Sequence, residues 1–197
     1  MKHQNGDAPD RLLVIIGGSG TGKSTLARTL QARWLPAQWL HFSADTLLHC
    51  LPQMVVDSAN QRNDWSSIDR PLLRSSTHAC LHALLDAGHR VIFDCVVMSE
   101  RAARDLVVSL RVCGPYVVRL TCSWDETRQR TFSRGDRTLE EAERGFQTAG
   151  EHLLADCDVD TTGRGPAEVA DDVIAAIAQR PRAMAWRENL ARYPIEP

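Results

Sequence analysis

Residues 12–24 read LLVIIGGSGTGKS, and this stretch decides the fold. Its five leading apolar residues run directly into glycines, which is typical of a strand buried on both faces of a parallel sheet. The rest fits the pattern GxxxxGK[ST] without a mismatch, and its members are Gly17, Gly18, Ser19, Gly20, Thr21, Gly22, Lys23 and Ser24. A helix is predicted from Lys23 to about Trp34, so the pattern lies between a strand and a helix, as a phosphate-binding loop does.

The chemistry of such a loop follows from its backbone. Glycines let successive N–H groups point at phosphate oxygens, and the helix that follows adds the positive end of its dipole. We expect Lys23 to reach the β- and γ-phosphates of ATP, Ser24 to ligate Mg²⁺, and Thr25 to complete the nucleotide-binding set. The alternative is a glycine-rich turn that only caps a helix. Of the 23 basic residues only Lys2 and Lys23 are lysines, so one of the two lysines of the chain is the lysine of this loop.

Apolar strands alternate with helical segments along the whole chain. Further strands are predicted at 38–42, 91–94, 116–122 and 157–160. Helices are predicted at 71–88, at 99–112, in two stretches of 124–154 interrupted around 133–138, at 166–179, and at 182–192, where the last one packs onto the body. Residues 46–70 predict a short helix and then a long loop. The alternation predicts an α/β P-loop protein with a five-stranded parallel sheet flanked by helices, in one domain spanning 1–197.

Two aspartates follow predicted strands. Asp45 comes just after the second strand, where it can face the γ-phosphate and accept a proton from an attacking alcohol. The alternative role for Asp45 is the N-cap of a helix that begins at Thr46. Asp94 ends the third strand as a Walker-B aspartate does, so we expect it to hold the Mg²⁺ shell or to orient Ser24. The alternative for Asp94 is a turn residue.

Arginines gather in the segment TRQRTFSRGDR, and they are Arg128, Arg130, Arg134 and Arg137. The pair Gly135-Asp136 breaks the helical pattern there, which favours a mobile lid over about 128–147. Arginines that close over ATP would neutralise charge on the transferred phosphoryl group. The alternative is a solvated helix face, which is the usual role of a charge run.

Composition excludes several classes of protein. The chain has 197 residues with 23 basic and 25 acidic side chains, so it lacks the positive excess of a nucleic-acid binder. No apolar run approaches the roughly 18 residues of a membrane span, and the polar N-terminus lacks the core of a signal peptide. We therefore expect a cytoplasmic protein without nucleic-acid or membrane partners. The sequence carries no signal about oligomeric state.

The chain resembles the chloramphenicol 3-O-phosphotransferase family of small P-loop kinases from about Arg11 to Ile177. The segments that carry the resemblance are GGSGTGKST, WLHFSADTLLHCLP, RVIFDC, RGDR and DVDTTGRGPAEVADDVIAAI. It implies a fold of the nucleotide-kinase type with a helical lid, and ATP with Mg²⁺. It also implies that Asp45 is the base that deprotonates the acceptor hydroxyl, that Arg134 and Arg137 are catalytic lid arginines, and that Arg130 contacts the nucleotide. The loop at 161–164 would lie near the adenine.

The resemblance implies transfer of the γ-phosphoryl group of ATP to a hydroxyl of a small molecule, with chloramphenicol or a related antibiotic as the suggested acceptor. The chain departs from the family at Cys95, where many members have a second aspartate, and in residues 50–75, which should shape the acceptor pocket. Three alternatives stay open. They are a metabolite kinase that acts on a sugar nucleotide or nucleoside, as zeta-toxin-type kinases do, a nucleotide-dependent binding module without transferase activity, and a nucleic-acid end kinase.

Overall fold

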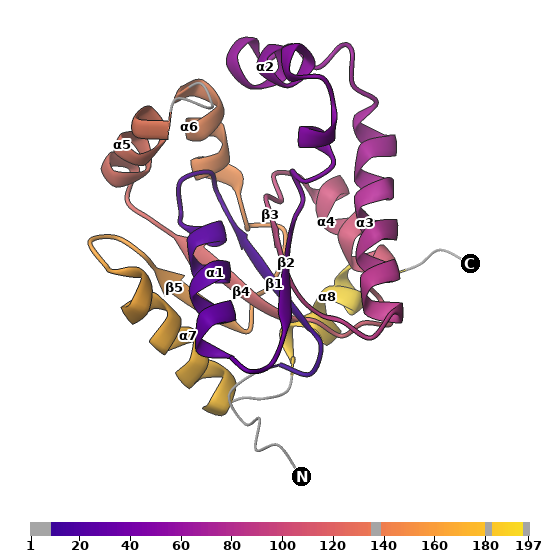
Figure 1. Ribbon diagram of the computed structural model, residues 1–197, viewed down its shortest axis with the longest axis vertical. Coiled ribbons are helices and arrows are strands. Elements are labelled where there is room, and N and C mark those ends of the chain that lie inside the picture. Colours follow the sequence, from indigo (N-terminus) through magenta and orange to yellow (C-terminus); the bar gives the residue numbers. More distant parts are fainter. Residues whose placement is uncertain (1–8, 135–138, 180–182, 195–197) are drawn as a thin grey trace.

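A five-stranded parallel sheet forms the centre of the computed structural model, which describes residues 9–134, 139–179 and 183–194 (Figure 1). The strand order is β2-β3-β1-β4-β5, so the strand that leads into the P-loop lies in the middle. The strands are β1 Leu12–Gly17, β2 Trp39–Ser43, β3 Arg90–Cys95, β4 Tyr116–Thr121 and β5 Cys157–Asp160. The predicted α/β class and the parallel sheet are confirmed, with the second strand one residue further along than expected.

Helices cover both faces of the sheet and bury its alternating side chains. Leu13 and Ile15 of β1 pack in one core with α1 (Lys23–Arg33) and α7 (Pro166–Gln179). Val14 and Ile16 point to the opposite core, against α3 (Arg70–Asp86), α4 (Glu100–Ser109) and α8 (Ala185–Arg192). β1 is therefore buried on both faces, which is why its sequence is continuously apolar.

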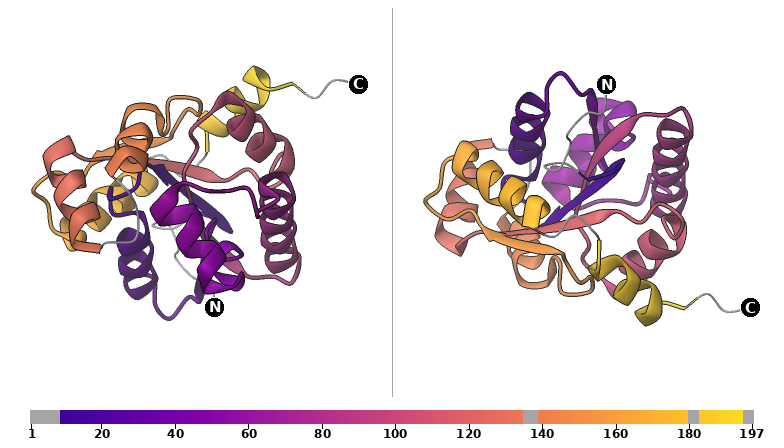
Figure 2. Two further views of the ribbon diagram at one scale, coloured as in Figure 1. Left: turned by 90° about the horizontal axis from the view of Figure 1, so that it is seen from above. Right: turned by 90° about the horizontal axis from the view of Figure 1, so that it is seen from below.

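Three helices lie at the end of the molecule where the strands have their carboxyl ends (Figure 1). They are α2 (Gln53–Arg62), α5 (Trp124–Arg134) and α6 (Leu139–Thr148). Seen from above, α2 lies between the α5–α6 pair and α3 (Figure 2, left). In open α/β sheets ligands bind at this end, so these helices surround the place where a site is expected.

The prediction of a long loop within residues 46–70 is wrong. A short 3₁₀-helix at Leu48–Cys50 is followed by the ten-residue helix α2, and a loop connects only Asn63 to α3. Pro52 and Asn63 are residue types that are common in loops, but here they lie at the two ends of the helix. Pro52 is its N-cap, and Asn63 ends it in the left-handed conformation with φ of 52°. Burial of Val56 and Ala59 then stabilises α2 on the body.

The other helices agree with the prediction. The two helical stretches expected within 124–154 are α5 and α6, and residues 135–138 between them lie outside the described part. Pro71 lies in the first turn of α3, and the terminal helix expected at 182–192 is α8. Within the described ranges no helix is both long and apolar enough to cross a membrane.

Two buried asparagines allow a matched test of stability. Asn189 of α8 is fully buried, and its amide accepts a hydrogen bond from Leu154 N at 2.9 Å and donates one to Leu154 O at 2.9 Å. Asn60 of α2 is also buried, but its Oδ1 has no hydrogen-bond partner among the described residues. A satisfied amide stabilises a fold, whereas an unsatisfied one costs about 1–3 kcal/mol.

We expect Asn189→Leu to lower Tm by roughly 5–10 °C, because it leaves two backbone groups of Leu154 unpaired. Asn60→Leu should leave Tm unchanged or raise it by about 2–4 °C, because it removes an unpaired polar atom. Thermal unfolding followed by circular dichroism measures both shifts. A decrease in Tm of similar size in the two variants would show that the side chain of Asn60 stabilises the fold, and would contradict this prediction.

Candidate active site

The P-loop takes the conformation that its glycines predict. Gly17 has φ of 153°, and a Cβ there would lie 2.6 Å from the carbonyl oxygen of Leu120 on the neighbouring strand. Gly22 has φ of 91° and is the N-cap of α1, so the helix begins at Lys23. The loop therefore turns tightly from β1 into a helix N-terminus, which is the geometry that directs backbone N–H groups at phosphate oxygens.

Side-chain hydrogen bonds hold the loop in place. Thr21 Oγ1 donates to Gly18 O at 2.9 Å, and Lys23 Nζ donates to the same carbonyl at 2.8 Å. Arg130 of α5 reaches across, and its Nη1 donates to Gly20 O at 3.1 Å. The predicted nucleotide-binding residue Arg130 thus lies against the P-loop, although it is far away in the sequence.

Asp94 is the centre of a hydrogen-bond network under the P-loop. It is 2% exposed, and its Oδ2 accepts a hydrogen bond from Ser24 Oγ at 2.7 Å. The same oxygen lies 2.9 Å from Nε2 of His41 on β2. Burial alone would raise the pKa of Asp94, but hydrogen bonds from His41, Ser43 and Ser24 and the charge of Lys23 lower it to about 2.

The pairing of Ser24 with an ionised Asp94 fits a magnesium ion. Mg²⁺ prefers hard oxygen ligands, and a hydroxyl and a carboxylate oxygen lie side by side here at the start of α1. The structure brings these two predicted metal residues together. The turn-residue alternative for Asp94 is wrong, because Asp94 lies within β3 and its buried side chain is hydrogen-bonded to Ser24 and His41.

Asp45 lies where two cavities meet. The first, which we call the P-loop cleft, has a volume of about 530 Å³ and is lined by Lys23, Ser24, Asp45, Asp94 and neighbouring residues. The second, which we call the α3 cavity, has a volume of about 200 Å³ and lies between α3, β3 and α4. Asp45, Ala44, Cys95 and Val96 line both. The side chain of Asp45 does not cap the short helix after it, whose N-cap is Leu47, so the capping alternative is wrong.

The α3 cavity has mostly apolar walls. Leu48, Leu73, Phe93 and Leu106 contribute to them, and Trp65 comes from the loop after α2. Residues 50–75, which are expected to shape the acceptor pocket, contribute Trp65, Arg70, Leu73 and Arg74 to this cavity, whereas Met54 is 76% exposed and Val56 belongs to the buried face of α2. Binding of the acceptor in this cavity stays a prediction. Burial raises the pKa of the Cys95 thiol to about 12, with a further rise from Asp94, so Cys95 is an inert lining group at neutral pH.

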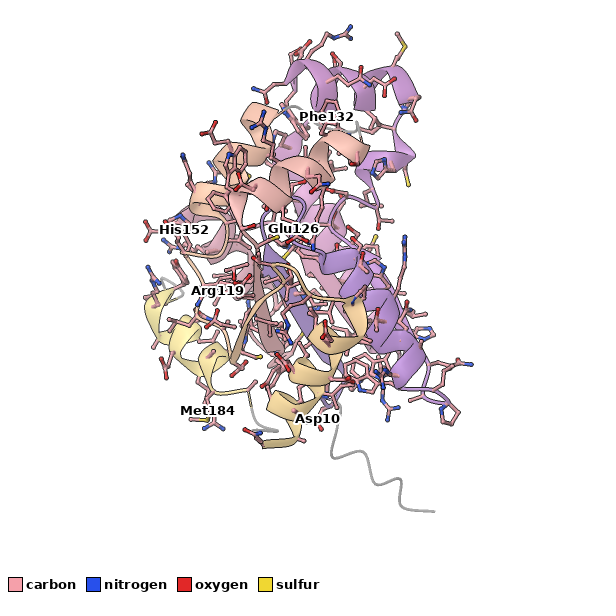
Figure 3. The ribbon with its side chains drawn as sticks, turned by 90° about the vertical axis from the view of Figure 1, so that its left-hand side faces the viewer. Asp10, Arg119, Glu126, Phe132, His152 and Met184 are labelled. Atoms are coloured by element: carbon pink, nitrogen blue, oxygen red, sulfur yellow. The ribbon has the colours of Figure 1, made fainter. Side chains whose placement is uncertain are left out.

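A third pocket adjoins the P-loop on its other side. This α5 pocket has a volume of about 590 Å³ and is lined by Glu126, Arg130, Thr161, Arg164 and other residues. It shares Gly20, Gly22 and Thr25 with the P-loop cleft. Figure 3 shows Glu126 near the level of the sheet and Phe132 further up the molecule on the same helix. The three cavities form a continuous series, from the α5 pocket past the P-loop to the α3 cavity.

The predicted lid arginines are only partly described. Arg134 is the last residue of α5, but its side chain is not among the described ones, and Arg137 lies outside the described residues altogether. The helices of the expected lid segment are present as α5 and α6. Closure over a nucleotide stays a prediction.

Two groups at the site are not among the site residues predicted from the sequence. His41 is on a strand, and only the pairing of β2 with β3 brings it to Asp94. Arg70 and Arg74 line the α3 cavity from α3, where the sequence predicts a helix but no site. No local signal identifies either group, because each depends on contacts between distant segments.

Comparison with known proteins gives a family match over most of the chain. The family model described as "Chloramphenicol phosphotransferase-like protein" matches residues 10–178. A guanylate kinase of Nocardia farcinica is 30% identical over 165 residues, which is 75% of this chain and 81% of the relative.

Solved structures show a similar fold. A sugar kinase of Janibacter sp. HTCC2649 has a TM-score of 0.66 and 19% identity, over 88% of this chain and 97% of that one. The tunicamycin resistance protein of Deinococcus radiodurans has a TM-score of 0.57 and 19% identity, over 85% of this chain and 95% of that one. At these identities the structures establish the P-loop kinase fold.

Proposed function

Because the chain belongs to the chloramphenicol phosphotransferase-like family, we propose that it transfers the γ-phosphoryl group of ATP to a hydroxyl of a small molecule. The fold and the family support a P-loop kinase. The observation that carries the hydroxyl acceptor is the position of Asp45, which lines both the cleft beside Lys23 and Ser24 and the apolar α3 cavity. A carboxylate between a phosphate-binding cleft and a second cavity is placed to take a proton from an alcohol bound there.

Each part of the site has a role in this proposal. The adenosine would occupy the α5 pocket, and the triphosphate would lie along the P-loop, where Lys23 contacts the β- and γ-phosphates. Ser24 directly and Asp94 through water would hold Mg²⁺, which would neutralise charge on the phosphates. Asp45 would remove the acceptor proton as the oxygen attacks the γ-phosphorus, while the bond from that phosphorus to the β,γ-bridging oxygen breaks and ADP leaves. Arg134 and Arg137 would stabilise the transferred group when the lid segment closes.

Chloramphenicol or a related antibiotic is the first candidate acceptor, because the family carries that name. A metabolite kinase acting on a sugar nucleotide or nucleoside is the second, since the sugar kinase shares the fold. The guanylate kinase similarity suggests GMP as a third. GMP fits Asp45 less well, because a phosphate acceptor is largely ionised at neutral pH and needs no base.

The proposal is tested by incubating the protein with Mg²⁺, ATP labelled in the γ-phosphate and each candidate acceptor in turn. We expect label in an organic phosphate ester of at least one alcohol, separated from inorganic phosphate by chromatography. ATP alone should give only slow release of inorganic phosphate. Hydrolysis at the same rate with every acceptor, and no ester, would instead support the nucleotide-dependent binding module.

A further inference from the structure

The α3 cavity contains two arginines in addition to Asp45. Arg70 and Arg74 come from the first two turns of α3 and line the cavity together with its apolar walls. Asp45 is the one carboxylate among the described residues that line it. Apart from the group placed to act as a base, the charge on these walls is therefore positive.

Arg70 lies against an aromatic ring at this cavity. Its guanidinium carbon lies 4.7 Å from the centroid of the Trp65 ring, and Trp65 also lines the cavity. The ring is oriented in turn by a hydrogen bond from Trp65 Nε1 to Asn63 Oδ1 at 3.2 Å. No carboxylate pairs with Arg70 in the described part of the chain. Stacking leaves the in-plane N–H donors of a guanidinium available, so Arg70 keeps the groups that recognise an anion.

Arg74 is only weakly neutralised. Its Nε lies 3.3 Å from Oδ2 of Asp105 on α4, and both side chains are at least one-third exposed. Burial, together with the positive charge of Arg74, lowers the pKa of His78 to about 4, and His78 also lines the cavity. His78 is therefore neutral at pH 7, and it adds no charge to the cavity.

We infer that the acceptor carries an anionic group, a carboxylate or a phosphate, which Arg70 and Arg74 bind while its hydroxyl lies at Asp45. Arg70 is exposed and the Arg74 side chain is about one-third exposed, so a neutral acceptor would displace water only from the guanidinium faces that line the cavity. It would not replace those hydrogen bonds, which is unfavourable. An anion replaces those bonds with stronger, charge-assisted ones. The hydroxyl at Asp45 rests on the proposed function, whereas anion binding by the arginines does not.

This inference separates the candidate acceptors. Chloramphenicol has no ionised group, so it would leave the arginines unused. A sugar nucleotide or a hydroxylated acid would use them. The acceptor class is therefore an alcohol that carries an acidic group and places an apolar part in the α3 cavity, which has a volume of about 200 Å³ and opens into the P-loop cleft.

Two matched pairs of probes test the inference by binding alone. Shikimate is compared with its neutral methyl ester, and guanosine 5′-monophosphate with guanosine, by isothermal titration calorimetry with a non-hydrolysable ATP analogue and Mg²⁺ present. We expect the anionic member of at least one pair to bind about tenfold more tightly than its neutral partner. The pair that shows the preference distinguishes a carboxylate from a phosphate.

Three variants locate the preference. Arg70→Gln and Arg74→Gln should each remove most of it, and Arg74→Lys should restore part, because lysine keeps the charge but loses the planar fork. Arg101→Gln on α4 is the control, since Arg101 is exposed and does not line the cavity, and it should keep the full preference. Equal affinity within both pairs, absence of anion binding, or an equal loss in Arg101→Gln would overturn the inference. Because turnover is not measured, failure of phosphoryl transfer would leave this result standing.

Discussion

Asp45→Asn is expected to lower kcat for phosphoryl transfer by about 10²–10⁴-fold, which is the range that a general base contributes. Asparagine keeps the size and polarity of the side chain but does not accept the proton of the acceptor hydroxyl. The affinity for ATP should change by less than about twofold, because the phosphates are held by the P-loop and Lys23. Steady-state kinetics with the acceptor found by labelled ATP measures kcat, and fluorescence titration with an ATP analogue measures binding.

The matched control for this variant is Asp86→Asn, which makes the same change at the exposed end of α3. It should leave both quantities unchanged. If Asp45→Asn keeps kcat within a few-fold of the wild type, Asp45 is not the base, and an acceptor that arrives already ionised, such as a phosphate, becomes the better explanation.

Lys23→Ala is expected to weaken both ATP binding and transfer, each by about 10²-fold or more, because the only ammonium of the described P-loop cleft is removed. Lys23→Arg should weaken ATP binding and phosphoryl transfer almost as much. A planar guanidinium does not replace a compact ammonium on a flexible stem where Lys23 Nζ lies close to Gly18 O. Binding of an ATP analogue and kcat are measured separately for each variant.

Lys2→Ala is the natural control for this second prediction, since Lys2 is the only other lysine of the chain. It should bind and transfer as the wild type does. Wild-type affinity in Lys23→Ala would mean that the loop binds its ligand through backbone groups alone, and that the lysine has another role.

The parts of the site that could be predicted from the sequence are those formed by residues that are close together in the chain. The P-loop, the strand before it and Asp94 after the apolar run Val91-Ile92-Phe93 are local patterns, and the structure joins Ser24 to Asp94 as expected. The fold class followed from the same alternation of strands and helices.

The parts that could not be predicted depend on how distant segments meet. His41 contacts Asp94 only because β2 pairs with β3 in register. Helix α2 was missed because Pro52 and Asn63 are equally typical of a loop and of the two ends of a helix. Arg70 and Arg74 are recognised as site residues only because other segments bring Trp65 and Asp45 to the same cavity.

The central claim is that Asp45 lies between the γ-phosphate and the acceptor hydroxyl. It is tested most directly by a crystal structure with Mg²⁺, a non-hydrolysable ATP analogue and an acceptor identified by labelled ATP. The account predicts the analogue along the P-loop and an acceptor hydroxyl within about 3 Å of an Asp45 carboxylate oxygen, in line with the γ-phosphate. An acceptor bound outside the α3 cavity, or one whose reacting oxygen lies beyond reach of Asp45, would contradict it.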